Sequence, residues 1–220
     1  MNAVVRRLGL CDYETVWRAM QAYTAARTAA ATDEIWLLEH RPVLTLGLGG
    51  RREHVLDDRG VPVVHCDRGG QVTYHAPGQL VAYLLLDLKR RGLTVKTLVQ
   101  RIEQSVIDLL GDYGIVASRR DGAPGVYVDG AKIAALGFRV RRGCCYHGLA
   151  LNVELDLAPY SGINPCGFPG LAVTRLRDLG VTDGVAAVGE RLLPHLIASL
   201  AGNRGSPVGD GLPARSVALG

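Results

Sequence analysis

The stretch GVYVDGAKIAALGFRV, residues 125–140, decides the fold class of this chain. Its residues alternate in character on both sides of Asp129–Gly130, and this dipeptide suits the two positive-φ positions of a type I′ hairpin turn. The stretch therefore predicts two antiparallel strands joined by a tight turn. The segment YHGLALNVEL, residues 146–155, predicts a further antiparallel strand directly after this hairpin.

Strand-like and helical runs surround the hairpin. Four strand-like runs precede it: IWLLEH, VLTLGL, VPVVHCD and LVAYLLLDL, at residues 35–40, 43–48, 61–67 and 80–88. Apolar residues at helical spacing predict helices from Asp12 to about Ala31, from Thr94 to Gly111 or Gly114, and over residues 185–200, where Pro194 bends or shortens the last one. Helices and strands do not alternate regularly, so we expect an α+β fold with a mainly antiparallel or mixed β-sheet flanked by helices.

Length and composition indicate an ordinary globular protein. With 220 residues, 48% of them hydrophobic, the chain can bury a full core, and we expect one catalytic domain over residues 1–202. Residues 203–220 lose all periodicity and predict a flexible C-terminal tail. No window of 18 apolar residues and no secretory signal is visible, so we expect a cytoplasmic protein without a membrane partner. A net charge of +4 and only 5% aromatic residues give nucleic-acid binding little support.

Cofactor and metal motifs are weak throughout the sequence. The five cysteines are odd in number and show no CxxC spacing, which argues against a disulfide framework and a structural zinc site. The most dinucleotide-like segment, GLGGRR at residues 47–52, has Arg52 where the third glycine belongs, and no GxxxxGK[ST] motif occurs. We therefore expect neither a metal nor a cofactor.

The segment RGGQVTYHAPGQ, residues 68–79, has the composition of a binding loop before a buried strand. Gly69, Gly70 and Gly78 let the backbone approach a ligand closely or adopt positive φ, and Pro77 fixes a bend. A tight connection between two strands, without any ligand, explains the same composition.

Lys132 and Cys166 are the candidates for chemistry. The chain holds three lysines among its 25 basic residues, and Lys132 alone lies among small and apolar neighbours. If the Lys132 amine is removed from water, it can exchange a proton near neutrality, which an arginine cannot do. The alternative is a lysine at the end of a hairpin whose ammonium stays in water. Cys166 lies in the loop SGINPCGFPG, where a nucleophile can be reached, although a buried, inert thiol is the alternative.

Three segments together resemble a known family: RGGQVTYHAPGQ, then GVYVDGAKIAALG with RRGCCYHGLALNVELDL, and INPCG. They are similar to the motifs of the lipoyl(octanoyl) transferases, also called lipoate-protein ligase B, in the same order from about Glu39 to Gly170. The resemblance implies that an octanoyl group moves from acyl carrier protein to a lysine of a lipoyl domain through a thioester on the enzyme, as the first step of endogenous protein lipoylation.

The resemblance also implies partners, a fold and roles for single residues. The donor is octanoyl-acyl carrier protein, and the acceptors are the lipoyl domains of 2-oxoacid dehydrogenase E2 subunits and the glycine cleavage H protein; we expect a monomer. The implied fold is the catalytic domain of lipoate-protein ligases and biotin protein ligases. Cys166 is the implied nucleophile and Lys132 its partner. The implied acyl-binding residues are Arg68, Gly69, Gly70, Gln71, Val72, Thr73, Tyr74, His75, Ala135, Leu136, Gly137, Gly148, Leu149 and Ala150.

Two other functions stay open at this point. An ATP-dependent lipoate or biotin ligase on the same fold would form an acyl-adenylate and would not require Cys166. A non-catalytic module that binds acyl groups or lipoyl domains would form no covalent adduct and would show no turnover.

Overall fold

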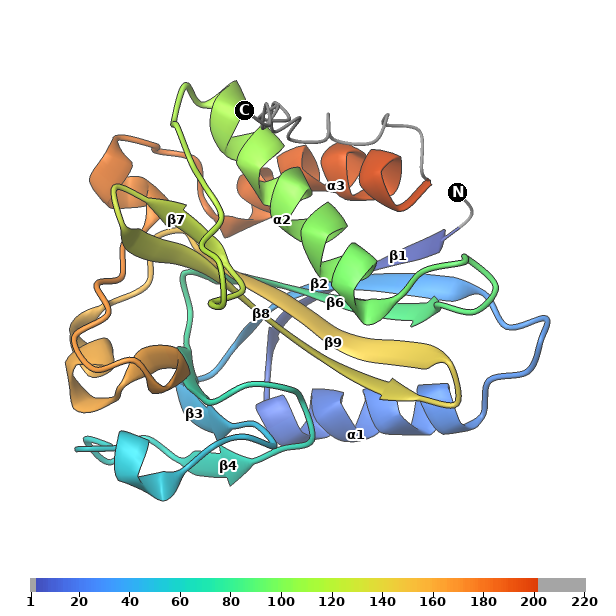
Figure 1. The fold of residues 1–220 in the computed structure, drawn as a ribbon, viewed down its shortest axis with the longest axis horizontal. Helices are drawn as coiled ribbons and strands as arrows, with labels where there is room; N and C mark the ends of the chain where they lie inside the picture. The colour runs from blue at the N-terminus through green and yellow to red at the C-terminus, as the bar shows by residue number, and fades with distance from the viewer. Residues whose placement is uncertain (1–2, 202–220) are drawn as a thin grey trace, which may run out of the picture.

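A six-stranded sheet forms the centre of the computed structural model, which describes residues 3–201 (Figure 1). Its strands, in spatial order, are β1 (Ala3–Cys11), β2 (Asp33–His40), β6 (Gln79–Asp87), β9 (Cys144–Asn152), β8 (Ala131–Arg141) and β7 (Val126–Val128). β1 runs parallel to β2, and every other neighbouring pair is antiparallel. The predicted hairpin is β7 and β8, and the predicted α+β class with a mainly antiparallel sheet is confirmed.

A second, three-stranded sheet lies beside the first. β3 (Val43–Leu46) pairs in parallel with β4 (Val63–His65) and antiparallel with β5 (Val72–His75). Figure 1 shows this small sheet next to the N-terminal end of α1 (Tyr13–Ala25), where Tyr13 packs with Val43 and Cys66. The sequence predicted β3 and β4, but it did not predict β5, which lies within the expected binding loop at residues 68–79, or the separation of this sheet from the large one.

Helices cover both faces of the large sheet. α1 lies on one face, and α2 (Val95–Asp112) and α3 (Val185–Ala201) lie together on the other (Figure 1). β6 supplies both cores: Leu80 and Leu84 face α2 and α3, whereas Val81 and Tyr83 face α1. A strand buried on both faces needs apolar residues at every position, which explains the uninterrupted apolar run LVAYLLL at residues 80–86. None of the helices within residues 3–201 is long and apolar enough to cross a membrane.

The helix boundaries agree with the prediction except in α1. Asp12 caps α1 and Thr94 caps α2, as expected. α1 ends at Ala25 and not near Ala31, because the alanine-rich continuation has no large apolar side chain to bury. α3 continues through Pro194 to Ala201, close to its predicted end.

Four short 3₁₀ helices complete the structure: η1 (Arg52–His54), η2 (Ala158–Gly162), η3 (Pro165–Gly167) and η4 (Leu176–Leu179). β1 was not predicted, because it is an edge strand whose mostly exposed side chains leave little apolar alternation to detect. The predicted tail at residues 203–220 lies outside the described residues.

Gly148 lies where two neighbouring strands leave no room for a side chain. A Cβ at this position would overlap the carbonyl oxygen of Ala82 on β6. We expect Gly148→Ala to lower the free energy of unfolding by about 1–3 kcal/mol, because backbone must move to relieve the overlap. Gly111→Ala in α2 is the control, since a Cβ there meets no atom within 4 Å and should add up to about 1 kcal/mol. Urea denaturation of both variants measures the difference, and equal effects would contradict this account.

Candidate active site

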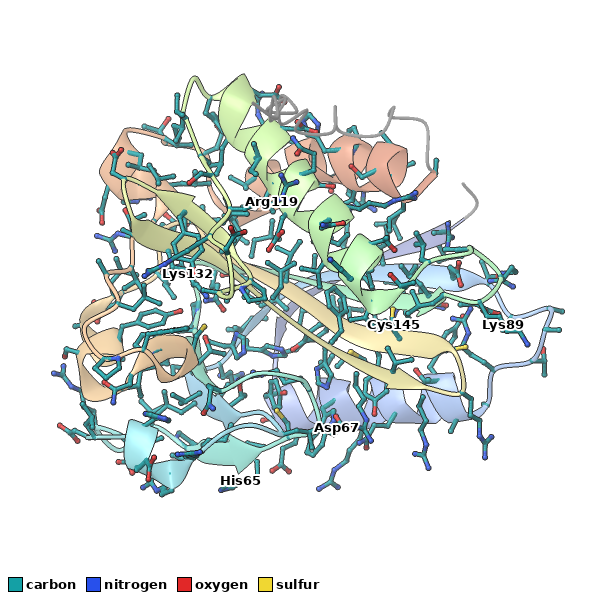
Figure 2. All side chains as sticks on the ribbon, viewed as in Figure 1. His65, Asp67, Lys89, Arg119, Lys132 and Cys145 are labelled. Atoms are coloured by element: carbon teal, nitrogen blue, oxygen red, sulfur yellow. The ribbon has the colours of Figure 1, made fainter. Side chains whose placement is uncertain are left out.

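Lys132 and Cys166 meet across the gap between the two sheets. The Lys132 Nζ donates a hydrogen bond to the Cys166 Sγ at 2.9 Å, although the two residues are 34 positions apart. Lys132 stands near the start of β8 and Cys166 in η3. Figure 2 shows Lys132 at the β7–β8 hairpin, at the opposite side of the molecule from Lys89. The structure therefore brings together the two residues that the sequence singled out.

The Lys132 ammonium is buried among neutral groups. Lys132 is only 4% exposed, whereas Lys89 and Lys96 lie exposed on the surface. Besides the thiol, it donates to the Pro124 carbonyl oxygen at 3.0 Å and lies 5.2 Å from the centre of the Tyr127 ring. Within residues 3–201, no carboxylate forms an ion pair with it, so a thiolate on Cys166 would be its natural counter-charge.

Cys166 is held in a backbone conformation that favours glycine. Its φ is 56°, in the left-handed region, and it lies between Pro165 and Gly167. The Gly167 N–H donates to the Asn164 carbonyl oxygen at 2.9 Å, and the Asn164 N–H donates to the His54 carbonyl oxygen at 2.8 Å. These bonds hold Cys166 in a strained backbone conformation in which the residue stays partly exposed, so that a partner molecule can reach the thiol.

A cavity of about 400 Å³ opens beside Lys132 and Cys166, which are called the dyad below. Its volume is within the range of small-molecule sites. All of the predicted acyl-binding residues line it except Tyr74. Side chains alternate along β5, so Thr73 and His75 face the cavity while Tyr74 turns away. The Tyr74 ring packs edge-to-face on Tyr160 at 5.7 Å in the core of the small sheet.

Arg68 supports one wall of this cavity. Its buried guanidinium donates to the carbonyl oxygens of Thr45 at 2.6 Å, Gln71 at 2.8 Å and Gly69 at 3.0 Å. The next residue, Gly69, donates its N–H to the Phe138 carbonyl oxygen of β8 at 2.9 Å. Arg68 therefore shapes the loop that lies over β8, and its donors are used within the protein.

Several residues that line the cavity were not in the predicted acyl site. They are Tyr13, Val81, Tyr83, Val95, Val99, Gly122, Ala123, Pro124, Phe138, His147 and Phe168. Alternation along β6 could have indicated Val81 and Tyr83 once one face was known to bind a ligand. No sequence signal indicated Tyr13, which reaches the cavity from the first turn of α1.

Two buried histidines lie in contact with each other near the cavity: His75 lines it, and His40 lies behind His75 with ring centroids 5.9 Å apart. The His40 Nε2 and the Tyr83 hydroxyl are 2.7 Å apart, and the His75 Nδ1 and the Gln79 Oε1 are also 2.7 Å apart. Burial lowers the pKa of His40 to about 4 and that of His75 to about 3. Both imidazoles are therefore neutral at pH 7.

These histidines make stability depend on pH. Because their folded-state pKa values lie below the unfolded value of about 6.5, the unfolded chain binds more protons at acidic pH. These two groups should not change the free energy of unfolding above about pH 6.5. Between about pH 6.5 and 4 the free energy of unfolding should fall with decreasing pH, by up to about 1.4 kcal/mol per pH unit for each histidine. Urea denaturation across this range checks the slope. His40→Phe should reduce it and His65→Ala, at an exposed site, should leave it unchanged.

Comparison with known proteins assigns the chain to a family. Residues 12–197 match the family model described as the lipoyl protein ligase A/B catalytic domain. An octanoyltransferase of Azoarcus sp. (strain BH72) is 65% identical over 198 residues, which cover 90% of this chain and 87% of the relative. An octanoyltransferase of Dechloromonas aromatica (strain RCB) is 58% identical over 200 residues, which cover 91% and 98%. The chain belongs to the octanoyltransferase family. It is therefore an enzyme of the acyltransferase class, as its motifs indicated.

Solved structures confirm the predicted fold. A lipoate-protein ligase A bound with ATP superimposes with a TM-score of 0.76 at 16% identity, covering 91% of this chain and 86% of that one. The biotin protein ligase from Aquifex aeolicus in complex with biotin and ATP gives 0.57 at 15% identity, covering 90% and 70%. At such identities the likeness concerns the fold alone.

Proposed function

We propose that this octanoyltransferase carries the octanoyl group on Cys166 between two partners, octanoyl-acyl carrier protein and a lipoyl domain. The observation that carries the proposal is the 2.9 Å contact between the Lys132 Nζ and the Cys166 Sγ at the side of an acyl-sized cavity. An ammonium at this distance favours the thiolate form of the cysteine, and the thiolate is the nucleophile.

In the first half-reaction the Cys166 thiolate attacks the carbonyl carbon of the octanoyl thioester on the donor. The bond between that carbon and the donor sulfur breaks, a new thioester forms on Cys166, and the donor's thiolate leaves. Cys166 loses its negative charge in this step. The buried Lys132 ammonium then has no anionic partner, which makes it more ready to give up its proton, and the departing thiolate can accept it.

In the second half-reaction the side-chain amine of a lipoyl-domain lysine attacks the Cys166 thioester. Lys132, now neutral, takes a proton from the attacking nitrogen as the amide forms. The bond to Cys166 breaks and returns the thiolate beside the restored ammonium. One lysine thus serves both halves, and the energy of the thioester removes any need for a nucleotide.

The cavity supplies the affinity for the acyl chain. An octanoyl group has about six methylenes that can be buried, at roughly 0.8 kcal/mol each, which gives up to about 5 kcal/mol before ordering costs. The segments that form its floor are rich in small residues, Ala135 and Gly137 on β8 opposite Ala150 and Gly148 on β9. A narrow apolar slot of this kind suits a straight chain.

Partners and compartment follow from the same chemistry. We infer that acyl carrier protein is the donor, and that lipoyl domains of 2-oxoacid dehydrogenase E2 subunits and the glycine cleavage H protein are the acceptors. A mechanism that depends on a free thiol needs a reducing compartment, and all five cysteines are free. We therefore place the reaction in the cytoplasm.

Octanoyl-loaded carrier protein should add one octanoyl mass to the enzyme, at Cys166. Intact-protein mass spectrometry with peptide mapping measures the adduct. Cys166→Ala should abolish it, and Cys144→Ser, outside the cavity, should leave it unchanged. Cys145 should stay unmodified, because burial raises its pKa to about 12. Nucleotide-dependent transfer that survives Cys166→Ala would support an ATP-dependent ligase, and an unmodified, inactive enzyme would support a binding module.

Lys132→Arg tests the proton-transfer role. Arginine keeps the positive charge but does not release a proton near neutrality, so we expect the turnover number to fall by roughly a hundredfold or more. Single-turnover acylation and transfer rates separate the two half-reactions, and transfer to the lipoyl domain should suffer more. Turnover close to that of the unmodified enzyme would exclude Lys132 as the base.

A further inference from the structure

The cavity has an open side and a closed end. Val95 and Phe168, at the margin of the cavity, are 45% and 41% exposed. Tyr13 and His75 also line the cavity, but they are 3% and 6% exposed. A chain that enters beside Cys166 therefore meets solvent in one direction and a wall of buried aromatic side chains in the other.

The strand register shows which residues of β8, β9 and β6 form the sheet side of the cavity. Ala135 on β8 stands opposite Ala150 on β9, and Ala150 stands opposite Val81 on β6. The next row on the same face runs from Gly137 through Gly148 to Tyr83. Neighbouring strands are about 4.8 Å apart, so Tyr83 lies on the order of 10 Å across the sheet from Gly137 on β8. Lys132 lies on the same strand, five residues before Gly137, and the cavity runs from Lys132 along this face to Tyr83.

The aromatic wall is held rigidly from behind. The Tyr13 ring stacks on His75 with centroids 6.0 Å apart and meets the edge of His40 at 5.1 Å. The Tyr83 hydroxyl is fixed by His40, and His75 is fixed by Gln79. In contrast, the buried Tyr13 hydroxyl forms no hydrogen bond with a nitrogen or oxygen atom of the described residues, and its polar neighbour is the Cys66 thiol. Shortening Tyr13 therefore removes volume and breaks at most a weak contact with sulfur.

We propose that the ring of Tyr13 sets the upper limit of acyl-chain length by closing the inner end of the cavity. The proposal rests on the proposed function, in which the acyl chain of the Cys166 thioester occupies this cavity. Tyr13 packs against Val43 and Cys66, so its truncation would extend the cavity into that small cluster at the junction of α1 and the small sheet. Tyr83 is less suited to this role, because its loss would leave His40 without its partner.

The proposal predicts a change in chain-length preference. Each further methylene that finds an apolar site improves the rate constant for acylation by roughly fourfold. A decanoyl group has two more methylenes than an octanoyl group, so Tyr13→Ala should raise the ratio of decanoyl to octanoyl acylation by roughly tenfold or more. Tyr13→Leu removes less volume and is a second variant in case the alanine protein does not fold. Tyr13→Phe keeps the ring and should leave the ratio unchanged.

The experiment compares carrier protein loaded with octanoyl, decanoyl or dodecanoyl groups, with the rate of adduct formation on Cys166 followed by mass spectrometry. Tyr23→Ala is the matched control, a tyrosine of the same helix that does not line the cavity. A ratio unchanged in Tyr13→Ala or Tyr13→Leu, with octanoyl uptake intact, would overturn the proposal. A raised ratio in Val99→Ala instead would also overturn it, because the chain would then lie along α2. Failure of octanoyl uptake in the unmodified enzyme would refute the proposed function itself.

Discussion

The site depends on the close backbone approach between the loop after β4 and strand β8. The Gly69 N–H donates to the Phe138 carbonyl oxygen at 2.9 Å, and a Cβ at Gly137 would lie 3.0 Å from the Gly69 carbonyl oxygen. This contact ties the small sheet to the large one and leaves a slot between them whose floor lacks bulky side chains. The Arg68 guanidinium holds the same loop from within by saturating its carbonyl oxygens. Side chains at these glycines would fill the slot or push the sheets apart.

The chemistry depends on a charge that the fold leaves partly unbalanced. A buried ammonium is costly to maintain, and Lys132 is compensated only by a carbonyl dipole, an aromatic ring and a thiol within the described residues. In the proposed mechanism, a thiolate on Cys166 balances this ammonium, and acylation of the sulfur removes that negative charge. The two half-reactions are then linked through one electrostatic balance.

Those parts of the fold that depend on local residue patterns could be predicted from the sequence. The hairpin at Asp129–Gly130 and the capped start of α2 were visible in turn chemistry and residue pattern. The pairing of Lys132 with Cys166 was expected only from the resemblance of the motifs to a known family. The sequence did not predict what depends on tertiary packing. β1 shows little apolar alternation, and the turning of Tyr74 away from the cavity follows from the pleat of β5, whose facing could not be known in advance. Tyr13 reaches the cavity only because α1 packs across the sheet, a contact with no local signature.

The separation of the scaffold from the two residues proposed for the chemistry allows proteins of low sequence identity to share this fold. The two sheets and the slot between them require small residues on β8 and β9 and apolar residues on β6, which many sequences can supply. The dyad needs only one lysine near a hairpin and one cysteine in a three-residue 3₁₀ turn. In the proposed mechanism the donor thioester already carries the energy for amide formation, so Cys166 has only to carry the acyl group and Lys132 only to transfer protons. The other residues that line the cavity then take no part in the bond changes and are free to select acyl chains by length, as proposed for Tyr13.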